Sequence, residues 1–210
     1  MSRPAPDTAQ SNWNAPNALT LLRIVLVPLF GWLLLVEGGD DESMRVWAFA
    51  IFLIAIITDK VDGELARRRD SVTDFGKLMD PIADKALTGM AFIGLSIIDE
   101  LWWWVTVVVL GREWSITLLR FWIIRYGVMP ASRGGKLKTT LQAIALCGFI
   151  LPLKMLDGVL GTLGEALWWA AAAVMAAAVV VTVVTGFDYL KEALRIRREG
   201  QARAGRGGSP

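Results

Sequence analysis

The sequence contains no histidine and a single cysteine, Cys147, which lies inside an apolar run. The lack of histidine excludes a Ser-His-Asp triad, a histidine general base and a histidine-ligated zinc ion. A lone cysteine can form neither an internal disulfide nor a cysteine-rich metal site. Any metal bound by this chain must therefore take oxygen ligands, which favours a hard cation such as Mg²⁺ or Mn²⁺.

Charged residues are scarce as well. They make up 20% of the 210 residues, against about 25% in an average soluble protein, whereas hydrophobic residues make up 54%. The net charge of +2 gives no reason to expect a nucleic-acid partner. Six apolar runs approach the roughly 20 residues that cross a bilayer as a helix, which predicts an all-α polytopic membrane protein with six transmembrane helices. The runs are 18–36, 44–58, 76–98, 101–124, 139–156 and 166–184.

The connections between these runs alternate in charge. Those after the first and third runs are acidic, whereas those after the second and fourth runs, and the C-terminal tail, are rich in Arg and Lys. The positive-inside rule then places both termini and the stretch 58–85 on the cytoplasmic side of the membrane. We expect 125–138 and the Gly-rich segment 157–165 to be loops, and the last residues, 203–210, to be disordered.

Four aspartates stand out in the stretch 58–85, which is dense in charge although apolar runs flank it. Asp59 and Asp62 are three residues apart, and Asp80 and Asp84 are four apart, so on helices each pair shares one face. Carboxylates beside membrane-length apolar segments are costly unless something neutralises them. The simplest neutraliser is a divalent metal ion, so this stretch predicts a metal site.

Carboxylates from two adjacent helices can hold one or two divalent cations, and two neighbouring cations can clamp a pyrophosphate during displacement at phosphorus. Gly63 and Gly76 have no side chain and let a nucleotide approach the backbone, and Arg67 is a candidate partner for a phosphate. Asp70 and Asp74, by contrast, are interpreted as solvated loop residues. The stretch therefore has the residue types that a metal-dependent reaction at phosphorus needs.

The segment 59–84 resembles the signature of the CDP-alcohol phosphotransferase family. That signature reads Asp-x-x-Asp-Gly-x-x-Ala-Arg, eight residues, Gly, three residues, Asp, three residues, Asp, and the chain matches every fixed position. The matching residues are Asp59, Asp62, Gly63, Ala66, Arg67, Gly76, Asp80 and Asp84. The family's six-helix fold and homodimeric habit agree with the predicted topology. We expect a flexible segment 1–15, a membrane catalytic domain 16–190 and a basic cytoplasmic tail 191–210.

The resemblance implies transfer of a phosphatidyl-type group from a CDP-linked lipid to an alcohol, with release of CMP. It places the protein in the bacterial cell membrane, with the active site facing the cytoplasm. It makes Asp59, Asp62 and Asp80 ligands of two Mg²⁺ or Mn²⁺ ions. Asp84 becomes the proton acceptor for the attacking hydroxyl and a further metal ligand. Residues expected to line the CDP-lipid are Asn17, Thr20, Asp62, Gly63, Arg67, Thr73 and Gly76.

Stretches outside the signature resemble the branch of the family that uses CDP-diacylglycerol as donor and glycerol 3-phosphate as acceptor. They are 16–28, 111–120 and 135–142. A phosphomonoester acceptor needs cationic partners, because charge-assisted hydrogen bonds are the ones that hold a phosphate. Arg112, Lys136 and Lys138 are the candidate residues for binding the acceptor phosphate.

Other interpretations of these cations stay open at this point. Lys136 and Lys138 also fit plain positive-inside topology or attraction to anionic lipid. Arg112 also fits an ion pair with Glu113. Arg23, in the first run, either snorkels to the interface or faces a polar cavity.

Alternatives to the function stay open too. Within the family they are a phosphatidylinositol phosphate synthase and a cardiolipin synthase of the CDP-alcohol type. A divalent-cation transporter is a more distant alternative, because it predicts acidic residues spread through the depth of the bilayer, whereas here they gather at one face.

Overall fold

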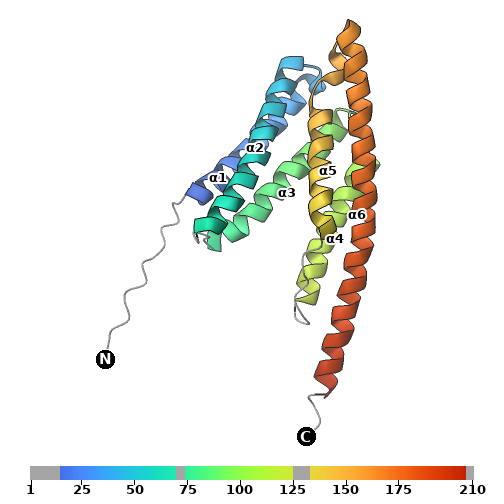
Figure 1. Cartoon of the computed structure of the whole chain (residues 1–210). Coiled ribbons are helices and arrows are strands. Elements are labelled where there is room, and N and C mark those ends of the chain that lie inside the picture. Colours follow the sequence, from blue (N-terminus) through green and yellow to red (C-terminus); the bar gives the residue numbers. More distant parts are fainter. Residues whose placement is uncertain (1–14, 70–73, 125–132, 207–210) are drawn as a thin grey trace, which may run out of the picture. The chain divides into compact units, whose positions relative to one another are not determined.

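The computed structural model describes the backbone of residues 15–69, 74–124 and 133–206 and the side chains of 20–58, 82–124 and 135–199. All regular structure in these ranges is helical (Figure 1). The elements are α1 (Ala15–Leu35), η1 (Val36–Gly39), α2 (Glu42–Arg69), α3 (Asp74–Ile97), α4 (Trp103–Ile123), α5 (Arg133–Ile150), η2 (Leu153–Met155) and α6 (Gly158–Arg206). They form two compact units, Met1–Gly94 with α1, α2 and most of α3, and Leu95–Pro210 with α4, α5 and α6.

In the first unit α1 packs against both α2 and α3. The rings of Phe30 in α1 and Phe52 in α2 lie 5.3 Å apart, and both side chains are fully buried. Gly31 of α1 faces Met90 of α3 so closely that a Cβ at Gly31 would lie 2.9 Å from the methionine side chain. The missing side chain at Gly31 therefore makes room for the methionine side chain that reaches it from α3.

The connection between α1 and α2 is the acidic turn that the sequence predicts. Glu37, Gly38 and Gly39 have φ angles of 51°, 72° and 86°. This is the left-handed region, which glycine enters without strain. The carboxylate of Asp41 then accepts a hydrogen bond from the N–H of Met44 at 2.9 Å, and this bond caps the first turn of α2.

In the second unit α6 is the common partner of α4 and α5 (Figure 1). One stripe of α6 is buried along its C-terminal half, with positions three or four residues apart as one helix face requires. The stripe consists of Ala178, Thr182, Thr185, Tyr189 and Ala193. Three of these five side chains carry a hydroxyl group, so the buried face of α6 is partly polar.

Helix α5 begins earlier than the sequence predicts. We expected a basic loop over 125–138, but the helix starts at Arg133, so Lys136 and Lys138 lie on its first turns. A glycine in a helix costs only about 1 kcal/mol relative to alanine, which tertiary packing readily outweighs. Inside this helix the hydroxyl of Thr139 donates to the carbonyl of Gly135 at 3.1 Å. Residues 125–132 lie outside the described residues.

Helix α6 is longer than predicted at both ends. It includes residues 158–165, which we expected to be a loop, and it continues to Arg206, so 203–206 are helical rather than disordered. The glycines that suggested a loop have a packing role. A Cβ at Gly161 or Gly164 would clash with the carbonyl oxygens of Leu156 and Leu153 in the preceding segment.

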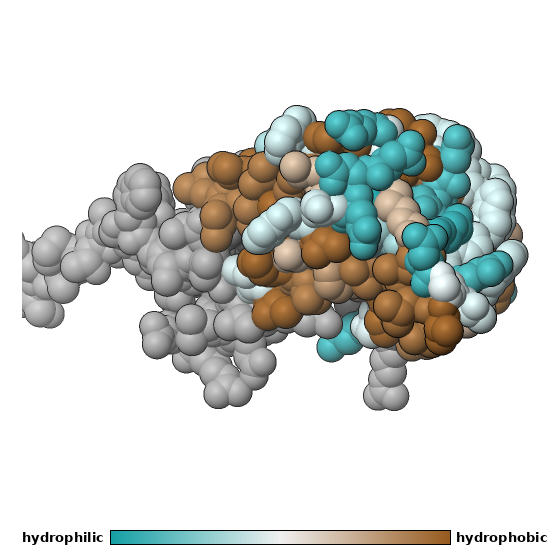
Figure 2. Space-filling view, turned by 90° about the horizontal axis from the view of Figure 1, so that it is seen from above, coloured by the Kyte–Doolittle hydropathy of each residue, from teal (hydrophilic) through white to brown (hydrophobic). Residues whose placement is uncertain are grey.

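Large apolar side chains remain exposed along the helices, and Figure 2 shows hydrophobic residues over much of the visible surface. On α4, for example, Leu118 is 65% exposed and Phe121 is 71% exposed. Extensive exposed apolar surface is typical of a surface that meets lipid. Among the described residues, Thr20–Gly39, Gly135–Met155 and Gly158–Glu199 are long and apolar enough to cross a membrane. The other three of the six expected spans stay predictions.

Gly148→Ala is expected to destabilise the second unit. A Cβ at Gly148 in α5 would lie 2.5 Å from the Cβ of Ala171 in α6, so the two helices would have to separate. Overpacking of this kind costs about 1–3 kcal/mol. The measurement is the thermal unfolding midpoint of the purified protein in detergent, which should fall.

Gly111→Ala in α4 is the matched control for this variant. Open space surrounds Gly111, and alanine favours a helix over glycine by about 0.5–1 kcal/mol. Its midpoint should therefore stay the same or rise. Equal midpoints for the two variants would contradict the close packing at Gly148.

Candidate active site

The predicted aspartate site lies around the end of α2 and the start of α3. α2 carries Asp59 and Asp62 in its C-terminal turns, and α3 carries Asp80 and Asp84. The backbone is helical at both pairs, which confirms the premise of the spacing argument. Most side chains predicted for this site lie outside the described residues, so their contacts stay predictions. They are Asn17, Asp59, Asp62, Gly63, Arg67, Thr73, Gly76 and Asp80.

Asp84 is the signature aspartate whose side chain the structure describes. It is exposed, whereas its neighbour Ala83 is 0% exposed and Leu87, one turn later, is 2% exposed. Helix α3 therefore turns Ala83 and Leu87 inward and leaves Asp84, about 100° and 60° away from them around the helix, exposed at its start. An accessible carboxylate is what the proton acceptor for an incoming hydroxyl requires.

Thr20 and Arg23 are buried near the start of α1, and each is 2% exposed. They are three residues apart and share one helix face. The burial of Arg23 contradicts the snorkelling alternative, because a snorkelling guanidinium keeps its charged head in water. The first turns of α1 thus direct polar side chains into the protein.

The second unit contains a group of four side chains that we call the arginine cluster: Arg112, Arg120, Thr185 and Tyr189. A terminal nitrogen of Arg112 donates a hydrogen bond to Thr185 Oγ1 at 2.8 Å, and its guanidinium carbon lies 5.4 Å from the centre of the Tyr189 ring. Arg120 lies 5.5 Å from the same ring and 3.4 Å from the tyrosine hydroxyl. Tyr189, only 7% exposed, is therefore shared by two cations.

Helix periodicity explains why both arginines of α4 meet α6. Val109, Ile116 and Ile123 are buried on α4, and Arg112 and Arg120 fall on the same stripe at helical spacing. The apolar members of the stripe anchor the helix in the unit. The same face directs half-buried Arg112 and exposed Arg120 toward α6, where both find partners on its polar stripe.

One nitrogen of Arg112 lacks a hydrogen-bond acceptor in this arrangement of described residues. Its Nε is buried and has no hydrogen bond among the described residues. A buried donor without an acceptor costs about 1–3 kcal/mol. An anionic group that reached this nitrogen would accept its hydrogen bond and remove that cost. The arginine cluster therefore contains one donor with which an anion could bond.

Lys138 of α5 forms an ion pair with Glu113 of α4. The lysine side chain is 5% exposed and the glutamate side chain is 29% exposed. The pairing of Arg112 with Glu113 that the sequence left open is not formed, because adjacent residues on a helix do not face each other. One turn after Lys138, Gln142 donates to the hydroxyl of Thr182 at 3.3 Å, which links α5 to α6.

Comparison with known proteins decides the family. The model of the CDP-alcohol phosphatidyltransferase family matches residues 13–187. The chain belongs to this family. The family that the aspartate signature indicated is thus confirmed, by a match that covers most of the chain. Membership of this family and the three long apolar helices together identify an integral membrane protein.

Relatives of known name share this family. A probable phosphatidylglycerophosphate synthase of Mycobacterium tuberculosis is 52% identical over 182 residues, which cover 87% of this chain and 82% of the relative. A CDP-diacylglycerol–glycerol-3-phosphate 3-phosphatidyltransferase of Bacillus subtilis is 38% identical over 200 residues, covering 87% of this chain and 98% of the relative. A protein of the same name from Escherichia coli is 38% identical over 142 residues, which cover 64% of this chain and 75% of the relative.

Within this member of the CDP-alcohol phosphatidyltransferase family, the predicted cations are not all alike. Arg112 and Lys138 are held by partners on neighbouring helices, whereas Lys136 is exposed. Sequence reasoning missed Thr185 and Tyr189. Their only signal is that they lie four residues apart, on one helix face, directly after the sixth apolar run.

Glu113→Gln is expected to lower the thermal midpoint of the protein. The change removes the carboxylate that faces the buried ammonium of Lys138, and breaking such a pair costs several kcal/mol when both groups are fully buried. Because Glu113 is partly exposed, we expect about 1–3 kcal/mol. Adding Lys138→Met to Glu113→Gln should restore part of the loss, since no buried charge then faces the amide. Additive losses in the double variant would contradict the coupling.

Proposed function

We propose that the chain transfers the phosphatidyl group of CDP-diacylglycerol to glycerol 3-phosphate, giving phosphatidylglycerophosphate and CMP. The observation that carries this proposal is the 52% identity over 182 residues to a relative named probable phosphatidylglycerophosphate synthase. Relatives whose names state both substrates support it further. The cations of the second unit fit an acceptor that bears a phosphate.

The aspartates are proposed as the metal site. Asp59, Asp62 and Asp80 would hold two divalent cations, Mg²⁺ or Mn²⁺, together with Asp84. The helical backbone at both pairs supports this assignment, since residues three or four apart share a helix face. When bound, the cations neutralise the pyrophosphate of the donor and the departing CMP.

Asp84 is the proposed general base. It would accept the proton of the acceptor hydroxyl as that oxygen bonds to the phosphorus that carries diacylglycerol. The pyrophosphate bond to this phosphorus breaks, and CMP leaves with the bond's electron pair. The exposure of Asp84 supports the role, because the acceptor must reach the carboxylate.

The remaining site residues are assigned by the match to the family signature and by burial. Thr20, buried on α1, would line the nucleotide pocket. The other residues proposed to contact the CDP-lipid are Asn17, Asp62, Gly63, Arg67, Thr73 and Gly76.

Arg112 is the residue proposed to contact the acceptor phosphate most directly, because its buried Nε has a proton to donate. Lys138 would add positive charge nearby while bonded to Glu113. Exposed Lys136, on the first turns of α5, would attract the acceptor from the cytoplasm.

The membrane arrangement completes the proposal. Six helices would cross the bacterial inner membrane with both termini and the active site on the cytoplasmic side, where a soluble acceptor meets a lipid donor. A homodimer is proposed as well. Ala170, Ala173 and Ala177 are exposed on one face of α6, and small residues of this kind favour close packing of membrane helices.

CMP release with each acceptor tests the function. Purified protein is incubated with CDP-diacylglycerol, Mg²⁺ and either glycerol 3-phosphate or inositol phosphate. Release is expected with glycerol 3-phosphate, and Asp84→Asn should lower kcat by about 10²–10⁴-fold because the proton acceptor is lost. Asp70→Asn, outside the signature, is the control and should keep normal turnover. Release with inositol phosphate alone would overturn the acceptor, and near-normal turnover of Asp84→Asn would overturn the base.

Thr185→Val tests the assignment of Arg112 to the acceptor. Valine keeps the shape of threonine but cannot accept the 2.8 Å hydrogen bond, so the guanidinium loses its fixed position. We expect the KM for glycerol 3-phosphate to rise about tenfold, equivalent to about 1.4 kcal/mol, with the KM for CDP-diacylglycerol unchanged. Thr182→Val is the matched control, because Thr182 accepts from Gln142 and not from Arg112. A parallel rise in both KM values would indicate a general structural role instead.

A further inference from the structure

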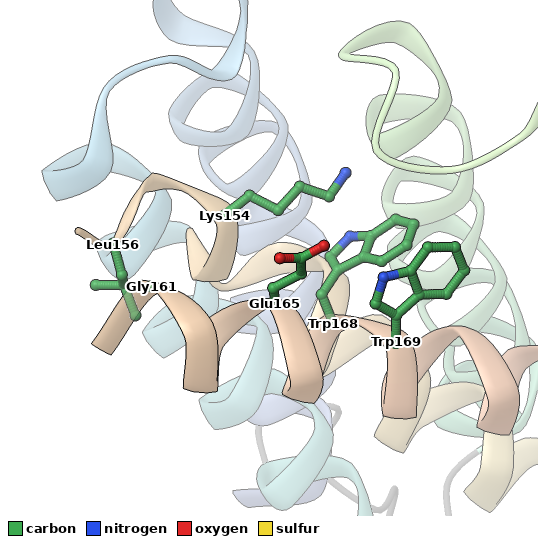
Figure 3. Close-up of a pocket in the computed structure, with 6 residues that line it drawn as sticks. All are labelled: Lys154, Leu156, Gly161, Glu165, Trp168 and Trp169. Carbon is green, nitrogen blue, oxygen red and sulfur yellow. The ribbon is translucent and has the colours of Figure 1, made fainter. Parts of the chain in front are cut away.

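A cavity of about 510 Å³ opens where η2 meets the start of α6 (Figure 3). Its size falls within the usual range for small-molecule sites. Nothing in the proposed reaction uses it. Its lining residues are Lys154, Leu156, Gly161, Glu165, Trp168 and Trp169.

The wall formed by Trp168 is held rigidly. Its indole N–H donates to a carboxylate oxygen of Glu100 at 2.9 Å, and the side chain is 7% exposed. The rings of Phe149 and Trp169 meet it edge to face at 5.4 Å and 5.0 Å. These contacts fix the ring before any ligand arrives, so little ordering cost is left for binding.

One indole of the cavity already binds an ammonium group of the protein itself. The ammonium of Lys154 lies 3.8 Å from the centre of the Trp168 ring, a cation–π contact. The same ammonium is 3.0 Å from the carboxylate of Glu100. The positive charge of Lys154 is therefore balanced within the wall, although its side chain stays 43% exposed.

Glu165 gives the cavity its excess charge. It is exposed, and no hydrogen bond or ion pair of its side chain is found among the described residues. It precedes Trp168 and Trp169 by three and four residues, so the carboxylate and both indoles rise from one face of α6, as Figure 3 shows. A carboxylate beside an indole that is 58% exposed, as Trp169 is, suits an organic ammonium group.

The place of the cavity points to a lipid as the ligand. It lies at the end of α5 opposite Lys136 and Lys138, and the 18 residues of α5 span about 27 Å, close to the thickness of a bilayer core. The neighbouring surface of α6 is apolar, with Leu160 and Leu163 63% and 56% exposed. Tryptophans near the end of a membrane-length helix, as Trp168 and Trp169 are, are typical of a membrane interface.

We propose that this cavity binds the phosphoethanolamine head group of a membrane lipid, at the end of α5 opposite Lys136 and Lys138. The lipid's ammonium group lies between Glu165 and the face of Trp169. Its phosphate meets the exposed side of the Lys154 ammonium, and the acyl chains follow the apolar side of α6. An anionic lipid without an ammonium group would leave Glu165 facing a negative charge, so the site discriminates against it.

Native mass spectrometry of the detergent-purified chain, titrated with dioleoyl-phosphatidylethanolamine or dioleoyl-phosphatidylglycerol, tests the proposal. The wild-type protein should bind the first lipid about tenfold more tightly, as a charge-assisted contact predicts. Glu165→Gln and Trp169→Leu should each reduce this preference to about twofold or less. Asp40→Asn, an exposed carboxylate in the turn between α1 and α2, is the matched control and should keep it.

Three outcomes would overturn the proposal. Equal affinity of the wild-type protein for the two lipids would remove the selectivity. An unchanged preference in Glu165→Gln would place the lipid elsewhere. Equal binding of free phosphoethanolamine and the lipid would make the site one for a soluble amine. Because the readout is binding, it is independent of CMP release and of the proposed reaction.

Discussion

Two opposite charges stand side by side in the middle of apolar α4, and each must be satisfied within the protein. Arg112 and Glu113 point about 100° apart around the helix, so they cannot pair with each other. Arg112 donates a hydrogen bond to Thr185 of α6, and Glu113 forms an ion pair with Lys138 of α5. A different packing of these helices would leave a partly buried charge without its partner, which costs about 1–3 kcal/mol. The adjacent charges therefore specify how the three helices fit together.

The helices themselves were predictable, because apolar runs of nearly membrane length leave few alternatives. The predicted boundaries failed where glycines were taken as signs of a loop. Gly161 and Gly164 lie inside α6, since only glycine fits against the carbonyls of the segment before the helix. A glycine that permits close packing and a glycine that permits a turn look the same in a sequence. The second role holds at Gly38 and Gly39, and at Gly158 just before Gly161, since all three have positive φ.

The aspartate signature can be read from the sequence for a different reason, and the site that it predicts stays a prediction. Its residues lie within 26 positions of one another, so their spacing is visible without knowledge of the fold. The partners of Arg112 are not visible in this way, because Thr185 lies 73 residues further along the chain. A threonine in an apolar run usually bonds to its own helix, and Thr185 does so too, donating to the carbonyl of Val181 at 2.7 Å. Only the packing of α4 on α6 reveals that its oxygen also accepts from an arginine.

Helix α6 connects the two ends of the second unit. Trp168 near its start is fixed by Glu100, and Thr185 and Tyr189 further along hold Arg112 and Arg120. From Trp168 to Thr185 the helix rises about 26 Å, close to the thickness of the bilayer core. A rotation of α6 about its axis would move the indole off Glu100 and the hydroxyl off Arg112 together, because both sit on one continuous helix. The contacts near the start of α6 thereby fix the register at which the arginine cluster is held.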